Sequence, residues 1–211
     1  MPGYSGQIYH KPKDPHLRKW MAFIDGENFT IRTQDKAKSR NIELKENYCY
    51  VRDTFFWIPN VKGGGEILQN IQDDLRLQDS SVRSYYYTSM AGDNDAIQNM
   101  KIKIRNCGFS PEVFKKIKKS DKAKGVDIAL TIGMLSHAYM NNYDVAVLYS
   151  GDGDYVPVVE EVKRTGKSVF VCGYEGSGLS NDLRLASDEF IDLCSIFDTM
   201  MAHHSEYNKQ L

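Results

Sequence analysis

The chain has 211 residues and a formal net charge of −1 at pH 7. Hydrophobic residues make up 41% and charged residues 26%, which is typical of a soluble globular protein with a substantial core. Its apolar runs are far shorter than the roughly 20 residues of a membrane span, and its polar first residues do not resemble a secretory signal. The four cysteines are widely spaced, without a CxxC pair or a zinc spacing, so we expect reduced thiols and a cytoplasmic location.

Strand-like and helix-like runs alternate along most of the chain. Apolar and β-branched runs predict strands at 20–24, 84–88, 110–117, 144–149 and 168–172, and a last apolar piece at 190–193. Apolar spacing and glycine stops predict helices at 61–77, 94–106, 126–140, 156–164 and 179–186. This alternation predicts an α/β fold with a mainly parallel sheet.

One stretch departs from the alternation. Residues 33–60 are dense in aromatic side chains and follow the first strand, which predicts an insertion, as a hairpin or a lid. Packing in a small satellite core and stacking against bases both explain such aromatics, and core packing is the commoner use. Around one domain at 20–195, we expect an N-terminal arm at 1–19 and a C-terminal tail at 196–211.

Carboxylates stand at three places where strands end or helices begin. Asp25 ends an apolar strand in FIDGENF, Asp127 lies in the first turn of a helix in KGVDIALTI, and Asp152 and Asp154 follow a strand in SGDGDY. Each has a structural explanation as a helix cap, a dipole partner or a turn residue. If the strands at 20–24 and 144–149 are neighbours, these acids converge and repel one another. A hard cation such as Mg²⁺ or Mn²⁺ resolves that repulsion.

FIDGEN, KGVDIAL and SGDGDYVPVVEEVKRTGK, followed by LSNDLRLASDEFIDL, resemble the NYN domain family, which is related to the PIN-like nucleases. The resemblance runs from about Trp20 to Leu193. It implies a three-layer α/β/α PIN-like fold and a metal-dependent ribonuclease site. The aromatic-rich stretch is longer than in compact members of the family.

Site residues follow from the resemblance by position. It implies that Asp25, Asp127 and Asp152 bind Mg²⁺ or Mn²⁺ and that Asp154 is a fourth acid beside them. It further implies that Asn28 orients substrate or water. The resemblance also implies that Ser150 adds a hydrogen bond and that Lys124 contacts phosphate, whereas Glu27 ranks lower because the family varies there. The expected reaction is in-line hydrolysis of an RNA phosphodiester bond by activated water.

A basic segment supports RNA as the partner. Residues 101–124 contain nine Lys or Arg and two acidic residues. A solvated face is the ordinary explanation of such a run, but beside an acidic site we interpret it as a phosphate-binding face. The candidate contacts are Lys115, Lys116, Lys118 and Lys119.

Two other functions stay open at this point. A phosphatase or phosphotransferase would use Asp25 as nucleophile and Glu27 as acid. A non-catalytic module would bind a metal and RNA, or a partner, without turnover. A homo-oligomer is also compatible with the sequence.

Overall fold

We describe a computed structural model of the chain over residues 18–46, 50–52, 54–57, 81–116, 125–195, 197–198 and 201. Six parallel strands form the main sheet, in the order β5-β4-β1-β6-β7-β8. They are β1 (Trp20–Asp25), β4 (Ser81–Ala91), β5 (Ser110–Lys116), β6 (Val145–Tyr149), β7 (Ser168–Gly173) and β8 (Glu189–Asp192). The predicted α/β class and the mainly parallel sheet are confirmed.

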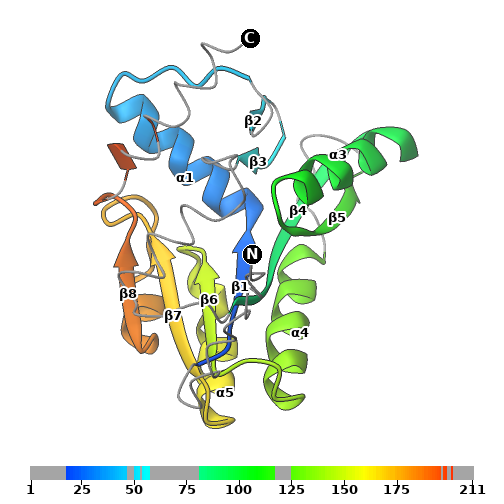
Figure 1. Ribbon diagram of the computed structural model, residues 1–211. Helices are drawn as coiled ribbons and strands as arrows, with labels where there is room; N and C mark the ends of the chain where they lie inside the picture. Colours follow the sequence, from blue (N-terminus) through cyan, green and yellow to red (C-terminus); the bar gives the residue numbers. More distant parts are fainter. Residues whose placement is uncertain are drawn as a thin grey trace, which may run out of the picture.

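Helices cover both faces of the sheet, which makes three layers (Figure 1). One face packs against α1 (Gly26–Ser39), α3 (Asn94–Asn106) and a two-stranded hairpin of β2 (Tyr50–Val51) and β3 (Phe56–Trp57). The other face packs against α4 (Val126–Tyr139), α5 (Val156–Arg164) and α6 (Asn181–Ala186). A 3-10 turn, η1 (Gly153–Tyr155), joins β6 to α5.

The central strand shows why the core divides in two. All six residues of β1 are buried, and successive side chains point to opposite faces. Trp20, Ala22 and Ile24 therefore belong to the core under α1 and α3, whereas Met21 and Phe23 belong to the core under α4 and α5. A strand buried on both faces is apolar throughout, as parallel strands are.

Helix α1 was not predicted from the sequence, and it changes the limits of the aromatic insertion. Residues 33–39 form the last turns of α1 rather than part of the insertion. The helix was missed because two of its buried positions are threonines. Thr33 donates a hydrogen bond to Phe29 O at 2.8 Å and lies 2.8 Å from the hydroxyl of Tyr174, while Thr30 Oγ1 lies 3.4 Å from the hydroxyl of Tyr86.

Three aromatic residues of the insertion are core residues, whereas Phe55 is partly buried. Tyr50, Phe56 and Trp57 are each 5% exposed or less, and Trp57 packs against Phe29 of α1. This agrees with core packing rather than base stacking, although the three rings join the main core on this face of the sheet instead of a small satellite core. The helix predicted at 61–77 lies outside the described residues.

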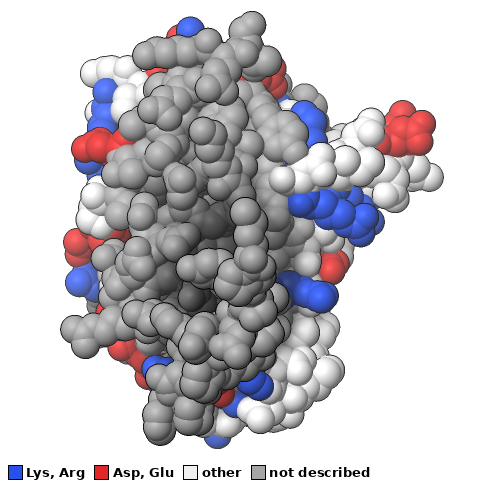
Figure 2. All heavy atoms as spheres, viewed as in Figure 1, with Lys and Arg blue, Asp and Glu red and all other residues white. Residues whose placement is uncertain are grey.

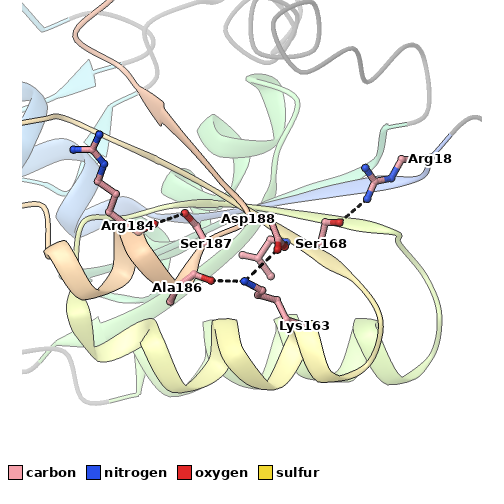
Figure 3. Close-up of polar contacts among 8 residues, drawn as sticks. Arg18, Lys163, Ser168, Arg184, Ala186, Ser187 and Asp188 are labelled. Carbon is pink, nitrogen blue, oxygen red and sulfur yellow. Dashed lines mark hydrogen bonds and ion pairs between the residues drawn. The ribbon is translucent and has the colours of Figure 1, made fainter.

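A polar network joins β7, α5, α6 and the bend that precedes β8 (Figure 3). Lys163 on α5 donates to the carbonyl of Ala186, the last residue of α6, at 2.7 Å and pairs with Asp188 at 3.1 Å. Asp188 also accepts from the backbone N–H of Val169 at 2.7 Å. Val169 lies near the start of β7. This network therefore lies at the N-terminal ends of the strands, away from their C-terminal ends.

Candidate functional site

The carboxyl ends of β1 and β6 meet where the strand order reverses. From β1 the chain proceeds to β4 and β5 on one side, then returns to β6 and proceeds outward to β7 and β8 on the other (Figure 1). In open parallel sheets, ligands bind at such a switch point. Ile24 pairs with Tyr149 in the register of β1 and β6, so Asp25 and Ser150 leave the sheet side by side.

Asp25 is a buried carboxylate, 5% exposed, that caps the start of α1. Its Oδ1 accepts from the backbone N–H of Asn28 at 3.0 Å, and its Oδ2 lies 3.1 Å from Ser150 Oγ and 3.3 Å from the hydroxyl of Tyr155. Burial raises its pKa to about 6, the Asn28 N–H opposes that rise, and the charge of Asp127 adds to it. The predicted cap role is confirmed, and this acid is also held at the C-terminal end of the central strand β1.

Asp127 reaches the same point from α4. The hydroxyl of Tyr155 lies 3.1 Å from Asp127 Oδ1, so one phenol contacts both acids. Burial, followed by the two neighbouring carboxylates, raises the Tyr155 pKa well above its usual range, so the hydroxyl stays protonated. Sequence reasoning assigned no role to Tyr155, although it directly follows Asp154 in the SGDGDY motif.

The loop between β6 and α5 is attached to this cluster by backbone contacts. Asn28 Oδ1 accepts from the N–H of Gly151 at 3.0 Å, and Ser150 Oγ accepts from the N–H of Asp152 at 3.1 Å. Asn28 therefore ties the start of α1 to the loop. Ser150 connects the buried carboxylate of Asp25 to the backbone of that loop.

Asp152 and Asp154 lie in this loop with exposed side chains. Asp152 Oδ1 accepts from the N–H of Asp154 at 3.0 Å and caps η1. Hydrogen bonds thus join Asp25, Asp127 and Ser150 through their side chains, whereas Asp152 joins them through its backbone. Asp154 stands at the outer side of the same turn.

The glycines beside the acids serve backbone packing. A Cβ on Gly26 would come within 2.7 Å of the carbonyl oxygen of Tyr87, and one on Gly151 would come equally close to that of Gly178. These positions accept no side chain without a shift of backbone.

The structure separates the two candidate lysines that it describes. Lys115 is exposed, whereas Lys116 is 5% exposed, with its ammonium 3.3 Å from Glu27 Oε2 and 4.5 Å from the centre of the Phe55 ring. The expectation that both lie on one phosphate-binding face is therefore corrected, because neighbouring residues of a strand point to opposite sides. Lys118, Lys119 and Lys124 lie outside the described residues.

Arg32 is a cation beside the site that the sequence did not reveal. It follows Asn28 by one turn of α1, and both residues line a cavity of about 10 Å³ with Ser150, Gly151 and Ser177. That volume holds about one water molecule, so a substrate would lie over the open edge of the sheet rather than in this cavity.

The donor atoms at this edge fit a hard cation. Asp25, Asp127 and Asp152 offer carboxylate oxygens and Ser150 offers a hydroxyl, which are the ligands that Mg²⁺ and Mn²⁺ prefer. Within the ranges that the structure describes, no three His, Cys, Asp or Glu side chains are gathered closely enough to form a metal-binding group. The chemistry of the residues fits the metal, while the Asp152 carboxylate is directed to its cap.

Comparison with known proteins places the chain in a family. The sequence model of the NYN domain matches residues 19–194, so the chain belongs to the NYN domain family. The three-layer fold and the acidic carboxyl edge of β1 and β6 agree with the PIN-like class to which that domain belongs. The resemblance stated from the sequence is confirmed.

Two known proteins are similar to the chain. The chain is 26% identical over 123 residues to the low amplitude and bright protein LabA of Synechococcus elongatus, covering 54% of this chain and 64% of that protein. The chain therefore spans less than two thirds of the length of LabA. A crystal structure of a protein of unknown function, VPA0982 from Vibrio parahaemolyticus, has a TM-score of 0.57 and 22% identity, covering 86% of this chain and 96% of that one. This second likeness shows the fold.

None of the described helices combines the length and the apolar character that crossing a membrane requires.

Proposed function

We propose that this chain is a metal-dependent endoribonuclease that hydrolyses RNA phosphodiester bonds at the carboxyl edge of β1 and β6. The observation that carries the proposal is the convergence of Asp25 and Asp127 on one hydroxyl at the switch point of the sheet. The contacts described around these carboxylates come from hydroxyl and amide groups, which leaves their charge to be balanced by a cation. Membership of the NYN family supports the nuclease class.

In this proposal Asp25, Asp127 and Asp152 hold Mg²⁺ or Mn²⁺, which supplies an activated water and neutralises charge on the phosphoryl group. Asn28 fixes the loop that carries Asp152, because its side chain accepts from Gly151. Ser150 orients the buried Asp25 carboxylate.

Two further roles complete the proposed site. Asp154 stands next along the loop as a further acid, at the edge where substrate arrives. Lys115 is exposed and suits contact with an RNA phosphate, and Arg32 offers a second positive charge beside Asn28. Lys118, Lys119 and Lys124 stay predictions, as do a cytoplasmic location and a homo-oligomer.

One observation favours a second candidate, a metal- and RNA-binding module without turnover. The described residues hold no ready-made group of three acids, and the Asp152 carboxylate caps η1 instead of facing Asp25. A phosphatase is less well supported. The Asp25 oxygens are both hydrogen-bonded and the side chain is buried, while Glu27 is paired with Lys116.

The test is a cleavage assay on labelled single-stranded and hairpin RNA with Mn²⁺, Mg²⁺ or EDTA. It compares the wild type with Asp127→Asn and Asp152→Asn, which preserve shape and hydrogen bonding but remove a charge. Asp95→Asn is the matched control, since Asp95 is an exposed aspartate in the first turn of α3, as Asp127 is in α4.

We expect cleavage that needs the metal, falls at least about 100-fold in the two site variants and is unchanged in the control. If the folded wild type binds RNA and metal but cuts no RNA with either ion, the nuclease proposal is wrong and the binding module takes its place.

A further inference from the structure

The hydroxyl of Tyr155 lies between two acids that the proposed function assigns to the metal. Its oxygen is 3.3 Å from Asp25 Oδ2 and 3.1 Å from Asp127 Oδ1, and the residue is 2% exposed. A phenol carries one hydrogen, so it donates to one carboxylate at a time. Two acids therefore share a single donor at the edge of the sheet.

The position of this hydroxyl is set by the core rather than by the acids. Tyr155 ends η1, and its ring belongs to the core cluster that contains Val158 and Leu183. Its ring is fixed by that packing, whereas Asp127 is exposed on α4. The tyrosine is thus the rigid member of the cluster, and Asp127 is the member that it can hold in place.

We propose that Tyr155 is a positioning residue that keeps Asp25 and Asp127 together while no cation is bound, and that Mg²⁺ or Mn²⁺ competes with its hydroxyl for the same two oxygens. This inference rests on the proposed metal site. It concerns a different property, which is how the metal-free protein tolerates two facing carboxylates.

Removal of the Tyr155 hydroxyl should lower the stability of the metal-free protein and raise its affinity for the metal. Without the hydroxyl, the two carboxylates face each other with less compensation, so the metal-free protein loses stability. An arriving cation then has no hydrogen bond to displace and relieves more repulsion. Tyr155→Phe should therefore melt at a lower temperature in EDTA, yet bind Mn²⁺ about tenfold more tightly than the wild type, the factor expected from one hydrogen bond to a charged group.

The control is Tyr143→Phe. Tyr143 belongs to the same core cluster, is fully buried, and donates to the carbonyl of Met134 at 2.8 Å. This substitution removes the buried hydrogen bond of a tyrosine hydroxyl that contacts neither Asp25 nor Asp127. Both variants and the wild type are melted in EDTA and in rising Mn²⁺, and Mn²⁺ affinity is measured by electron paramagnetic resonance of the free ion.

We expect both variants to melt lower in EDTA but only Tyr155→Phe to show tighter Mn²⁺ binding and a larger rise in melting temperature with Mn²⁺. Equal or weaker Mn²⁺ affinity in Tyr155→Phe, beside a wild type that binds Mn²⁺, overturns this inference alone. A wild type that binds no Mn²⁺ overturns the proposed metal site together with it.

A second measurement avoids reliance on the variant's folding. In wild-type protein labelled with ¹³C at the tyrosine ring carbon that bears the hydroxyl, Mg²⁺ should shift the Tyr155 signal and leave the Tyr143 signal in place. A Tyr155 signal unmoved at saturating Mg²⁺ overturns the inference.

Discussion

Asp25 has a structural role, and the proposed function gives the same side chain a chemical role. It caps α1, and it is also the buried carboxylate around which Ser150 and Tyr155 are arranged. Burial makes the charged form costly, and three hydrogen bonds recover only part of that cost, so its pKa rises to about 6. A carboxylate that destabilises the metal-free fold at neutral pH is compatible with the proposed metal site.

The pH dependence of stability follows from this pKa. An aspartate in the unfolded chain has a pKa of 3.8, so between about pH 4 and pH 6 the folded protein binds more protons than the unfolded one. The penalty from Asp25 therefore grows as the pH rises through this window and is complete above it. Asp25→Asn, which keeps the cap, should stabilise the metal-free protein by up to about 3 kcal/mol at pH 7.5 and by far less at pH 4.

Urea unfolding in EDTA at the two pH values measures the difference. A gain from Asp25→Asn that is the same at both would contradict the raised pKa. Adding Mn²⁺ at pH 7.5 should reverse the order, because only the wild type keeps the full set of carboxylates.

Lys115 and Lys116 show what residue-level reasoning overlooked. The strand was predicted correctly, yet both lysines were assigned to one face, although period-two alternation forbids it. The Lys116 ammonium is held by Glu27 and by the ring of Phe55. Lys116 is the buried member of the pair because residues distant in the chain enclose it. Only the fold could therefore show which of the two lysines is buried.

At the scale of elements, local signals predicted the second half of the chain best. Helix α5 was predicted at 156–164, its observed bounds, because a valine stripe precedes a glycine stop at Gly166. Strand β4 was predicted at 84–88 but extends over Ser81–Ala91. Helix α1 was missed, since its buried side includes Thr30 and Thr33 and so has no apolar stripe.

The contact of α5 with α6 and β8 gives a prediction for stability. Lys163→Met keeps the apolar stem but removes the ammonium that binds the carbonyl of Ala186 and pairs with Asp188 (Figure 3). We expect a loss of about 1 kcal/mol in the free energy of unfolding, since this pair is partly solvated. RNA cleavage should be unchanged below the melting temperature, because this network lies at the amino edge of the sheet. A variant that loses cleavage while fully folded would show that the two edges are coupled.

At the scale of the whole molecule, charge is distributed unevenly. The net charge is only −1. Lys and Arg side chains nevertheless gather where α3 and β5 lie, at the right of the view in Figure 2. The last turn of α3 carries Lys103 and Arg105, and β5, which starts at Ser110 just after this helix, carries Lys115 near its other end. Under the proposed function, a basic face formed by these residues would attract the RNA backbone in spite of the near-neutral total.

This face predicts how RNA affinity depends on salt. The double variant Lys103→Ala and Lys115→Ala should weaken RNA binding in EDTA and reduce the slope of log affinity against log salt by about 1 to 2. Arg164→Ala is the control, because Arg164 is an exposed cation at the far end of α5. Fluorescence anisotropy at several salt concentrations measures the slope. An equal effect of the control, or an unchanged slope in the double variant, would exclude this face as the RNA contact.

The sequence by itself determined the alternation of strands and helices, the family, and the acids at strand and helix ends, because these follow from local patterns and from motifs of neighbouring residues. Only the tertiary structure decided that β1 lies beside β6 and that the hydroxyl of Tyr155 meets both Asp25 and Asp127. Only the fold, too, revealed that Lys116 is enclosed. The physical reason is that strand order and burial depend on contacts between residues 28 to 130 positions apart in these examples, and no local spacing encodes them.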